Sequence, residues 1–181
     1  MLHGRCYMDP DMKDIKPEIA QARIERARSA VEKGIVYRLG KGGFNSANDS
    51  PGWDHGQCDC SGFVSWVLQT RRSPKKGRNF WIETTAIAHD VREGETMFVE
   101  CDPQPGCLCV YGDSGGHQGH IGVVTSATLN GDRDVIALRG IDCSMGSYRQ
   151  TGDAVQERDL TKVFGLNART IYCCLKQDVG T

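Results

Sequence analysis

The stretch that decides the fold of this chain is residues 58–68, which read CDCSGFVSWVL. From Phe63 onward, apolar side chains recur at positions i, i+1, i+4 and i+5, a spacing that gathers them on one face of a helix. The spacing predicts a helix that begins near Cys60 and Ser61 and is buried on its far side. Unpaired backbone N–H groups and the positive end of the helix dipole lie at such a start.

A thiol at the start of this helix suggests nucleophilic chemistry. The helix terminus favours negative charge, and the thiolate of Cys60 would be the attacking form. The same N–H groups could hold the oxyanion of an acyl-transfer intermediate. An ordinary buried cysteine is the alternative, because free cysteine is among the most buried residue types. The helix pattern alone does not decide between these interpretations.

Composition limits the classes of protein to which the chain can belong. Its 181 residues suffice for one domain with a good core, and we expect a loose N-terminal arm over 1–16 and a single catalytic domain over 17–181. A net charge of −1 gives no reason to expect nucleic acid or an anionic membrane as partner. No apolar run approaches the length of a membrane span, and the first residues lack the apolar core of a signal peptide.

Nine cysteines are many for a chain of this length. With one set aside as a nucleophile, eight remain, an even number that is compatible with disulfides but does not establish them. Zinc is the other structural interpretation, but Cys58 and Cys60, like Cys107 and Cys109, are separated by one residue and no C-x-x-C pair occurs. We therefore expect no metal and no cofactor. The remaining cysteines are Cys6, Cys101, Cys143, Cys173 and Cys174.

Helices come first and strands follow. Pro17 and Gly34 bracket a helix predicted over 17–33, and the helix at Cys60 is the second. A short helical or mixed segment is expected over 79–91, after a basic connection at 71–78 that we interpret as a solvated loop. Four strands are predicted at 107–111, 120–125, 134–141 and 170–175. This order is typical of the α+β class with a small antiparallel sheet.

Four blocks of the sequence resemble the NlpC-type cell-wall cysteine peptidases. The blocks are Tyr37–Gly43, Asp59–Val64, Pro105–Gly106 and Gly119–Val124, and they span roughly residues 20 to 145 in the family's order. The resemblance implies a compact papain-like core in which N-terminal helices, including the nucleophile helix, pack on the antiparallel sheet.

The resemblance also assigns roles to individual residues. Cys60 matches the nucleophile, and His120 matches the general base that takes the thiol proton and later protonates the leaving amine. Tyr37 matches a tyrosine beside the nucleophile that would bond the oxyanion or the substrate, and Ser61 would face the substrate. The other histidines (His3, His55, His89 and His117) are better explained as loop or surface residues.

The third member of the site is where the chain departs from the family pattern. The family usually carries His, and less often Asn or Gln, on the strand after the histidine strand, and this chain has none there. Asp142 is our choice, because a carboxylate would accept the His120 N–H and hold its tautomer. Cys143 is the alternative third residue, and Asp142 could equally be an exposed turn residue.

The function implied is hydrolysis of amide bonds in peptidoglycan stem peptides, typically between D-glutamate and a diamino acid, through a thioester on Cys60. Two alternatives stay open: a papain-like thiol hydrolase or acyltransferase acting on another amide or lipid substrate, and an inactive binding or assembly module. Without an export signal, we expect the chain to reach the periplasm or cell wall by phage or secretion machinery. An immunity or inhibitor protein is then a possible partner.

Overall fold

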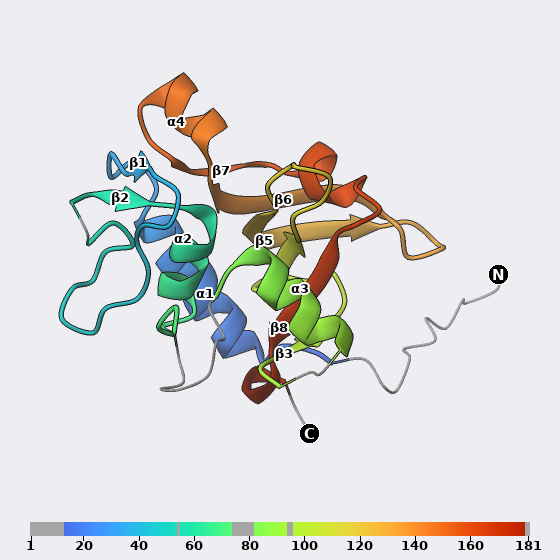
Figure 1. The fold of residues 1–181 in the computed structure, drawn as a ribbon. Helices are drawn as coiled ribbons and strands as arrows, with labels where there is room; N and C mark the ends of the chain where they lie inside the picture. Colours follow the sequence, from blue (N-terminus) through green and yellow to red (C-terminus); the bar gives the residue numbers. More distant parts are fainter. Residues whose placement is uncertain (1–12, 54, 74–81, 94–95, 180–181) are drawn as a thin grey trace.

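The computed structural model describes residues 13–53, 55–73, 82–93 and 96–179 (Figure 1). Its helices are α1 (Pro17–Ser29), α2 (Cys60–Val67), α3 (Thr84–Glu93) and α4 (Met145–Thr151), with a π-helical turn η1 (Thr161–Gly165) and a 3₁₀ turn η2 (Lys176–Asp178). Its strands are β1 (Val36–Tyr37), β2 (Gln57–Cys58), β3 (Phe98–Glu100), β4 (Leu108–Tyr111), β5 (His120–Leu129), β6 (Val135–Cys143), β7 (Val155–Asp159) and β8 (Ile171–Leu175). Both helices and strands are thus present, and the predicted α+β class is confirmed.

Six of the strands form one antiparallel sheet in the order β3-β8-β4-β5-β6-β7, while β1 and β2 form a separate parallel pair. The four predicted strands are β4, β5, β6 and β8. Strands β3 and β7 and helix α4 were not predicted. Strand β7 has the sequence VQERD, whose charged residues hide the apolar alternation that marks a half-buried strand.

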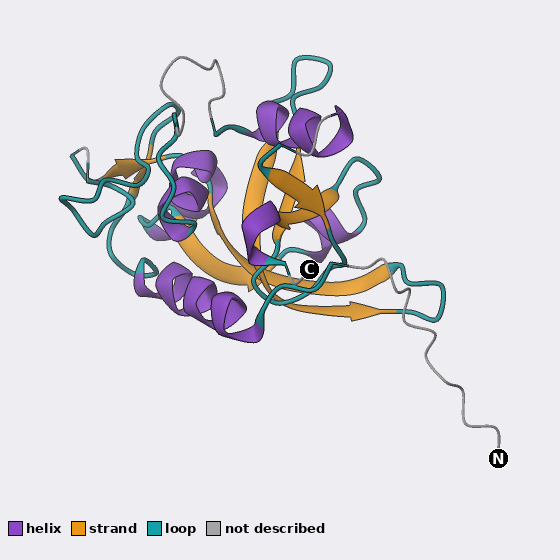
Figure 2. Cartoon of the chain, turned by 90° about the horizontal axis from the view of Figure 1, so that it is seen from below, coloured by secondary structure: helices purple, strands orange, loops and turns teal. Residues whose placement is uncertain are grey.

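Helices α2 and α3 pack on one face of the sheet, and α1 lies along its side with residues in the cores of both faces (Figure 2). Helices α1 and α2 pack on β5, and α3 packs on β3 and β4. Side chains alternate between faces along a strand, so every second residue reaches this layer. Phe63 of α2 is fully buried there, together with Val110 of β4, Val123 of β5 and Ile141 of β6. Helix α2, which carries Cys60, is therefore fixed by the main core.

A second core lies on the opposite face of the sheet. Phe164 of η1 is fully buried there against Val124 of β5 and Leu138 of β6. The residues of β5 and β6 that alternate with the first core, including His120 and Asp142, belong to this face. The face on which η1 packs is therefore the one that positions the polar residues discussed below.

Helix α1 is shorter than the sequence predicted. It begins at Pro17 as expected but ends at Ser29, before the predicted end at residue 33. Glu32 and Gly34 both have positive φ, at 61° and 69°, a backbone conformation that no α-helix accommodates. Of the expected N-terminal arm, residues 1–12 lie outside the described residues, and Ile15 is buried and paired with Val179.

The cysteines of the described residues are all buried, and none of them forms a disulfide. Cys6 lies outside this part of the chain. Within the same described ranges, no three His, Cys, Asp or Glu side chains are grouped so that they could hold a metal ion. No helix among the described residues is long and apolar enough to span a membrane.

Candidate active site

Cys60 is the first residue of α2, as the helix pattern predicted. Asp59 precedes it as the N-cap, and its Oδ1 accepts from the Gly62 N–H at 2.7 Å. Only glycine fits at position 62, because a Cβ there would fall well inside contact distance of the Lys41 carbonyl oxygen. The loop before the helix is therefore pressed against its first turn, and Cys60 is only 5% exposed.

Asp59 is also the centre of a buried polar cluster. Its Oδ2 accepts from the Gly40 N–H at 2.6 Å, and Arg72 forms an ion pair with its Oδ1. The Ser61 hydroxyl donates to Asp59 at 3.1 Å and accepts from Arg72 at 2.8 Å. Ser61 thus lines the cleft, with its hydroxyl already bonded within the protein.

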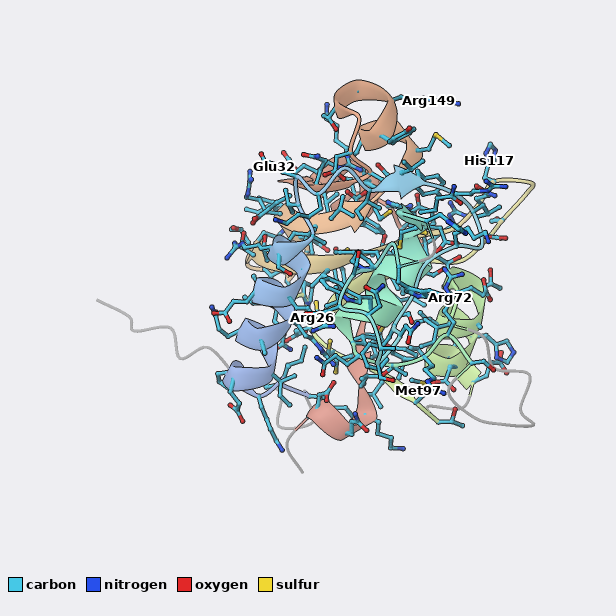
Figure 3. The ribbon with its side chains drawn as sticks, turned by 90° about the vertical axis from the view of Figure 1, so that its left-hand side faces the viewer. Arg26, Glu32, Arg72, Met97, His117 and Arg149 are labelled. Atoms are coloured by element: carbon cyan, nitrogen blue, oxygen red, sulfur yellow. The ribbon has the colours of Figure 1, made fainter. Side chains whose placement is uncertain are left out.

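Arg72 corrects the interpretation of 71–78 as a solvated loop. Its side chain turns inward toward α2 (Figure 3) and the residue is only 7% exposed, while residues 74–78 of that connection lie outside the described residues. A buried arginine that bonds both the N-cap carboxylate and a neighbouring hydroxyl fixes the start of the nucleophile helix. A run of basic residues in a loop carries no signal that one of them will be buried.

His120, Asp142 and Arg158 lie on a diagonal across three neighbouring strands. Residue 122 of β5 pairs with Asp142 of β6, and residue 140 of β6 pairs with Arg158 of β7, so each polar residue is the diagonal neighbour of the next on one face. His120 Nε2 lies 2.7 Å from Asp142 Oδ2. Arg158 donates to both oxygens, from Nε to Oδ1 at 2.9 Å and from Nη2 to Oδ2 at 2.6 Å.

The charges of His120, Asp142 and Arg158, the row of polar residues across the sheet, stabilise one another. Burial would lower the pKa of His120, but hydrogen bonds to Asp142 and to Cys60 outweigh it and raise that pKa to about 9. Burial would raise the pKa of the fully buried Asp142, but the bonds from His120 and Arg158 hold it below its ordinary value. The structure therefore favours a protonated His120 beside an ionised Asp142. With Nε2 on Asp142, Nδ1 is the ring nitrogen available to the thiol.

A cleft of about 240 Å³ opens beside Cys60. Tyr37, at the end of β1, lines it and is half-buried. Burial, followed by the negative charge that Cys60 and Asp59 can carry, raises the pKa of Tyr37, so its hydroxyl stays a donor at neutral pH. The cleft is also lined by Leu39, Gly40, Asp59, Ser61, Arg72, Glu83, Thr84, Asp113, Gln118 and Gly119.

The two candidates for the third residue face different surroundings. Asp142 contacts His120, whereas the Cys143 thiol lies in the first core and approaches the Cys58 carbonyl at 3.5 Å. The structure thus brings Cys60, His120 and Asp142 together and leaves Cys143 out of the row. Among the other histidines, His55, His89 and His117 are exposed and His3 lies outside the described residues.

Besides Arg72, two residues of the site were missed by the sequence analysis. Arg158 lies on the unpredicted strand β7, and Phe164 of η1 stacks on the His120 ring with centroids 5.4 Å apart and planes 13° apart. Phe164 fixes the imidazole plane on one side while Asp142 fixes its edge. The only available signal for Arg158 was an arginine in a weakly alternating segment, too common a pattern to single it out.

A protein-family model described as the CHAP domain matches residues 48–138. This domain is of the NlpC and papain-like amidase and peptidase class, so the resemblance read from the sequence is confirmed at that level. The matched segment contains Cys60 and His120 and ends before Asp142 and Arg158. No curated protein matches the chain.

Proposed function

The chain belongs to the CHAP domain family, and on that premise we propose that it cuts an amide bond of the peptidoglycan stem peptide with Cys60 as nucleophile. Membership indicates a cell-wall amidase or peptidase, since CHAP domains are generally hydrolases that act on peptidoglycan. The finer assignment is a D-glutamyl–diamino acid endopeptidase. The observation that carries the catalytic part of the proposal is the contact of His120 Nε2 with Asp142 Oδ2 at 2.7 Å, beside Cys60, whose thiol contributes to the raised pKa of His120.

The mechanism follows from that contact. The proton of the Cys60 thiol resides on His120 Nδ1 as part of the imidazolium, and the thiolate attacks the scissile carbonyl carbon. The oxyanion forms near the first turn of α2, where backbone N–H groups and the Tyr37 hydroxyl are the candidate donors. The imidazolium then protonates the leaving amine, a thioester remains on Cys60, and water activated by His120 releases the acid. Asp142 holds the imidazole in the required orientation throughout.

Mass spectrometry of purified muropeptides after incubation with the reduced protein tests this proposal. We expect wild type to cut inside the stem peptide, and Cys60→Ala and His120→Ala to release nothing while keeping the wild-type circular dichroism spectrum. Cys174→Ala is the matched control, because it removes a buried thiol from the second core and should leave cleavage intact. A chelator is expected to leave the rate unchanged.

The masses of the products decide the finer assignment. Products that split between D-glutamate and the diamino acid support the endopeptidase, whereas free intact stem peptides would show an amidase that cuts at the sugar. A folded wild type that leaves every muropeptide intact would refute the proposal and favour another acyl substrate.

A further inference from the structure

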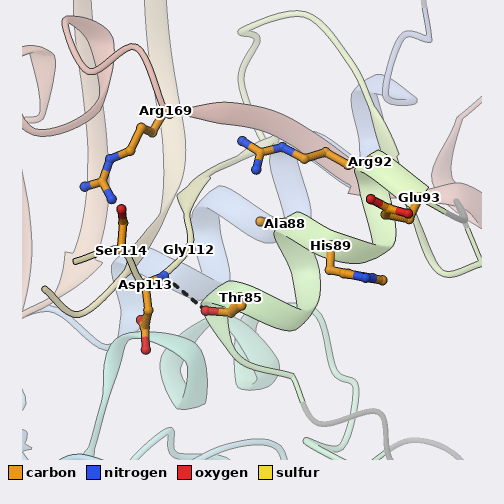
Figure 4. Close-up of a pocket in the computed structure, with 9 residues that line it drawn as sticks. All are labelled: Thr85, Ala88, His89, Arg92, Glu93, Gly112, Asp113, Ser114 and Arg169. Carbon is orange, nitrogen blue, oxygen red and sulfur yellow. Dashed lines mark hydrogen bonds between the residues drawn. The ribbon is translucent and has the colours of Figure 1, made fainter. Parts of the chain in front are cut away.

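A second hollow of about 300 Å³ adjoins the cleft (Figure 4). It lies between α3 and the segment that follows β4, and Arg169 closes its third side. Asp113 lines both the hollow and the cleft, and the successive residues Thr84 and Thr85 line one each. The two spaces are therefore parts of one continuous surface. The mechanism above uses nothing in the second one.

The wall between the two spaces is fixed by hydrogen bonds. The Asp113 N–H donates to the Thr85 hydroxyl at 3.0 Å (dashed in Figure 4), and Asp113 Oδ1 accepts from the Gly119 N–H at 2.5 Å. Gly112 lies so close to α3 that a Cβ there would be 3.2 Å from the Thr85 Cα. The hollow is thus formed before any ligand arrives, which lowers the entropic cost of binding.

Two arginines extend into the hollow from different elements. Arg92 comes from α3, and Arg169 from the segment before β8 points toward Ser114 (Figure 4). The Arg169 guanidinium lies 5.1 Å from the centre of the Tyr111 ring. Within the described part of the chain, neither arginine forms an ion pair. Two guanidinium groups that line one hollow and form no ion pair with a protein carboxylate suit an external one.

The two carboxylates that line the hollow, Asp113 and Glu93, form no ion pair with either arginine in the part of the chain that the structure describes. Asp113 points away from Arg169 in Figure 4 and is held by the Gly119 N–H. Glu93 is exposed, next to Arg92 in sequence, and no ion pair joins them in the described ranges. Both guanidinium groups are therefore left to a ligand.

The hollow lies on the histidine side of the cleft. Tyr37, Gly40 and Ser61 line the side of the nucleophile helix, whereas Asp113 and Gly119 come from the loop that leads into His120. The leaving amine receives its proton from His120, so the segment released first must lie on the histidine side. A peptide cut at an internal bond releases that segment with the C-terminal carboxylate of the chain.

We propose that Arg92 and Arg169 form a binding site for the C-terminal carboxylate of the stem peptide's leaving segment. This inference rests on the proposed function. The site would favour stem peptides with a free terminus over amidated or cross-linked ones, because only a free carboxylate can bond the two guanidinium groups.

Two synthetic stem peptides that differ only in a C-terminal carboxylate or carboxamide test the site. We expect wild type to show a kcat/KM about tenfold higher for the carboxylate, the size of one lost charged hydrogen bond. Arg92→Gln and Arg169→Gln should each bring that ratio close to one. Arg149→Gln is the matched control, because Arg149 is exposed on α4 and lines neither the cleft nor the hollow, and its ratio should equal that of wild type. A ratio that survives both substitutions would overturn the site.

Binding to Cys60→Ala separates the site from the proposed function. The carboxylate peptide is titrated by calorimetry into Cys60→Ala with and without Arg92→Gln and Arg169→Gln. If wild type cuts neither peptide, the proposed function fails, and the binding arm decides the hollow by itself. Binding about tenfold weaker in the arginine variants supports the site, and equal or undetectable binding in all of them overturns it.

Discussion

Replacing Asp142 by asparagine tests the row of His120, Asp142 and Arg158 at its centre. Asp142 Oδ2 lies within bonding distance of both His120 Nε2 and Arg158 Nη2, and Oδ1 accepts from Arg158 Nε. Asparagine has the same shape but only one acceptor oxygen, and its amide nitrogen is a donor. Either orientation of the amide therefore sets a donor against a donor. In a site where the asparagine contacts only the histidine, the amide could turn its oxygen toward the ring without placing its nitrogen against a second donor.

The magnitude follows from the better of the two orientations. With its oxygen toward His120, the amide nitrogen faces Arg158 Nε, and a polar group left without its partner costs about 1–3 kcal/mol. Asparagine also removes the charge that supports the imidazolium, so the pKa of His120 falls from about 9. Together we expect a loss of about 3 kcal/mol in the transition state, which is about 150-fold in kcat/KM. The unfolding free energy should fall by about 2 kcal/mol, less than for a fully buried pair because the Arg158 side chain is 35% exposed.

The assay is steady-state hydrolysis of a stem peptide with urea unfolding of the same preparations. The informative variant is the double one, Asp142→Asn with Arg158→Met, because methionine removes the donor that the amide nitrogen would face. We expect it to be about tenfold more active than Asp142→Asn alone. A folded double variant no more active than the single one would refute the reasoning, as would wild-type activity of Asp142→Asn.

Three further predictions concern the surroundings of this row. The pKa of His120 is raised from 6.5 to about 9, so its protonation stabilises the fold fully below pH 6.5 and this stabilisation is lost as the pH rises through 9. The unfolding free energy should fall by roughly 3 kcal/mol over this range. Urea titrations of wild type should show this loss, and those of His120→Gln should not. Gly119→Ala should lower kcat/KM at least about tenfold, because its Cβ would overlap the Thr84 hydroxyl and a β4 carbonyl, whereas Gly131→Ala has open space and should match wild type in the same assay. Phe164→Leu should lower the unfolding free energy by about 1 kcal/mol through loss of the ring that stacks on His120, and should lower kcat more than it raises KM; a change in neither would contradict the positioning role.

Helix α2, which begins at Cys60, could be predicted from the sequence alone. Apolar spacing after Phe63 and the polar start at Asp59 act within one helical turn, and such short-range patterns need no partner element. The strand that begins at His120 was predicted for the same reason. Helix α2 starts at Cys60, within the predicted first turn at Cys60 and Ser61, and four strands of the large sheet were predicted.

Which side chains meet was decided by the tertiary structure. Asp142 could be proposed only from its place along the chain, because the contact with His120 depends on the register between β5 and β6. Arg158 reaches Asp142 through the register of β6 with β7, a strand whose own sequence gives almost no signal. Register is set by pairing between distant segments and by the buried faces of the sheet. The burial of Arg72 against Asp59 has the same origin. The sequence thus determined the helix that begins at Cys60, whereas the pairing of distant strands and loops determined what surrounds His120.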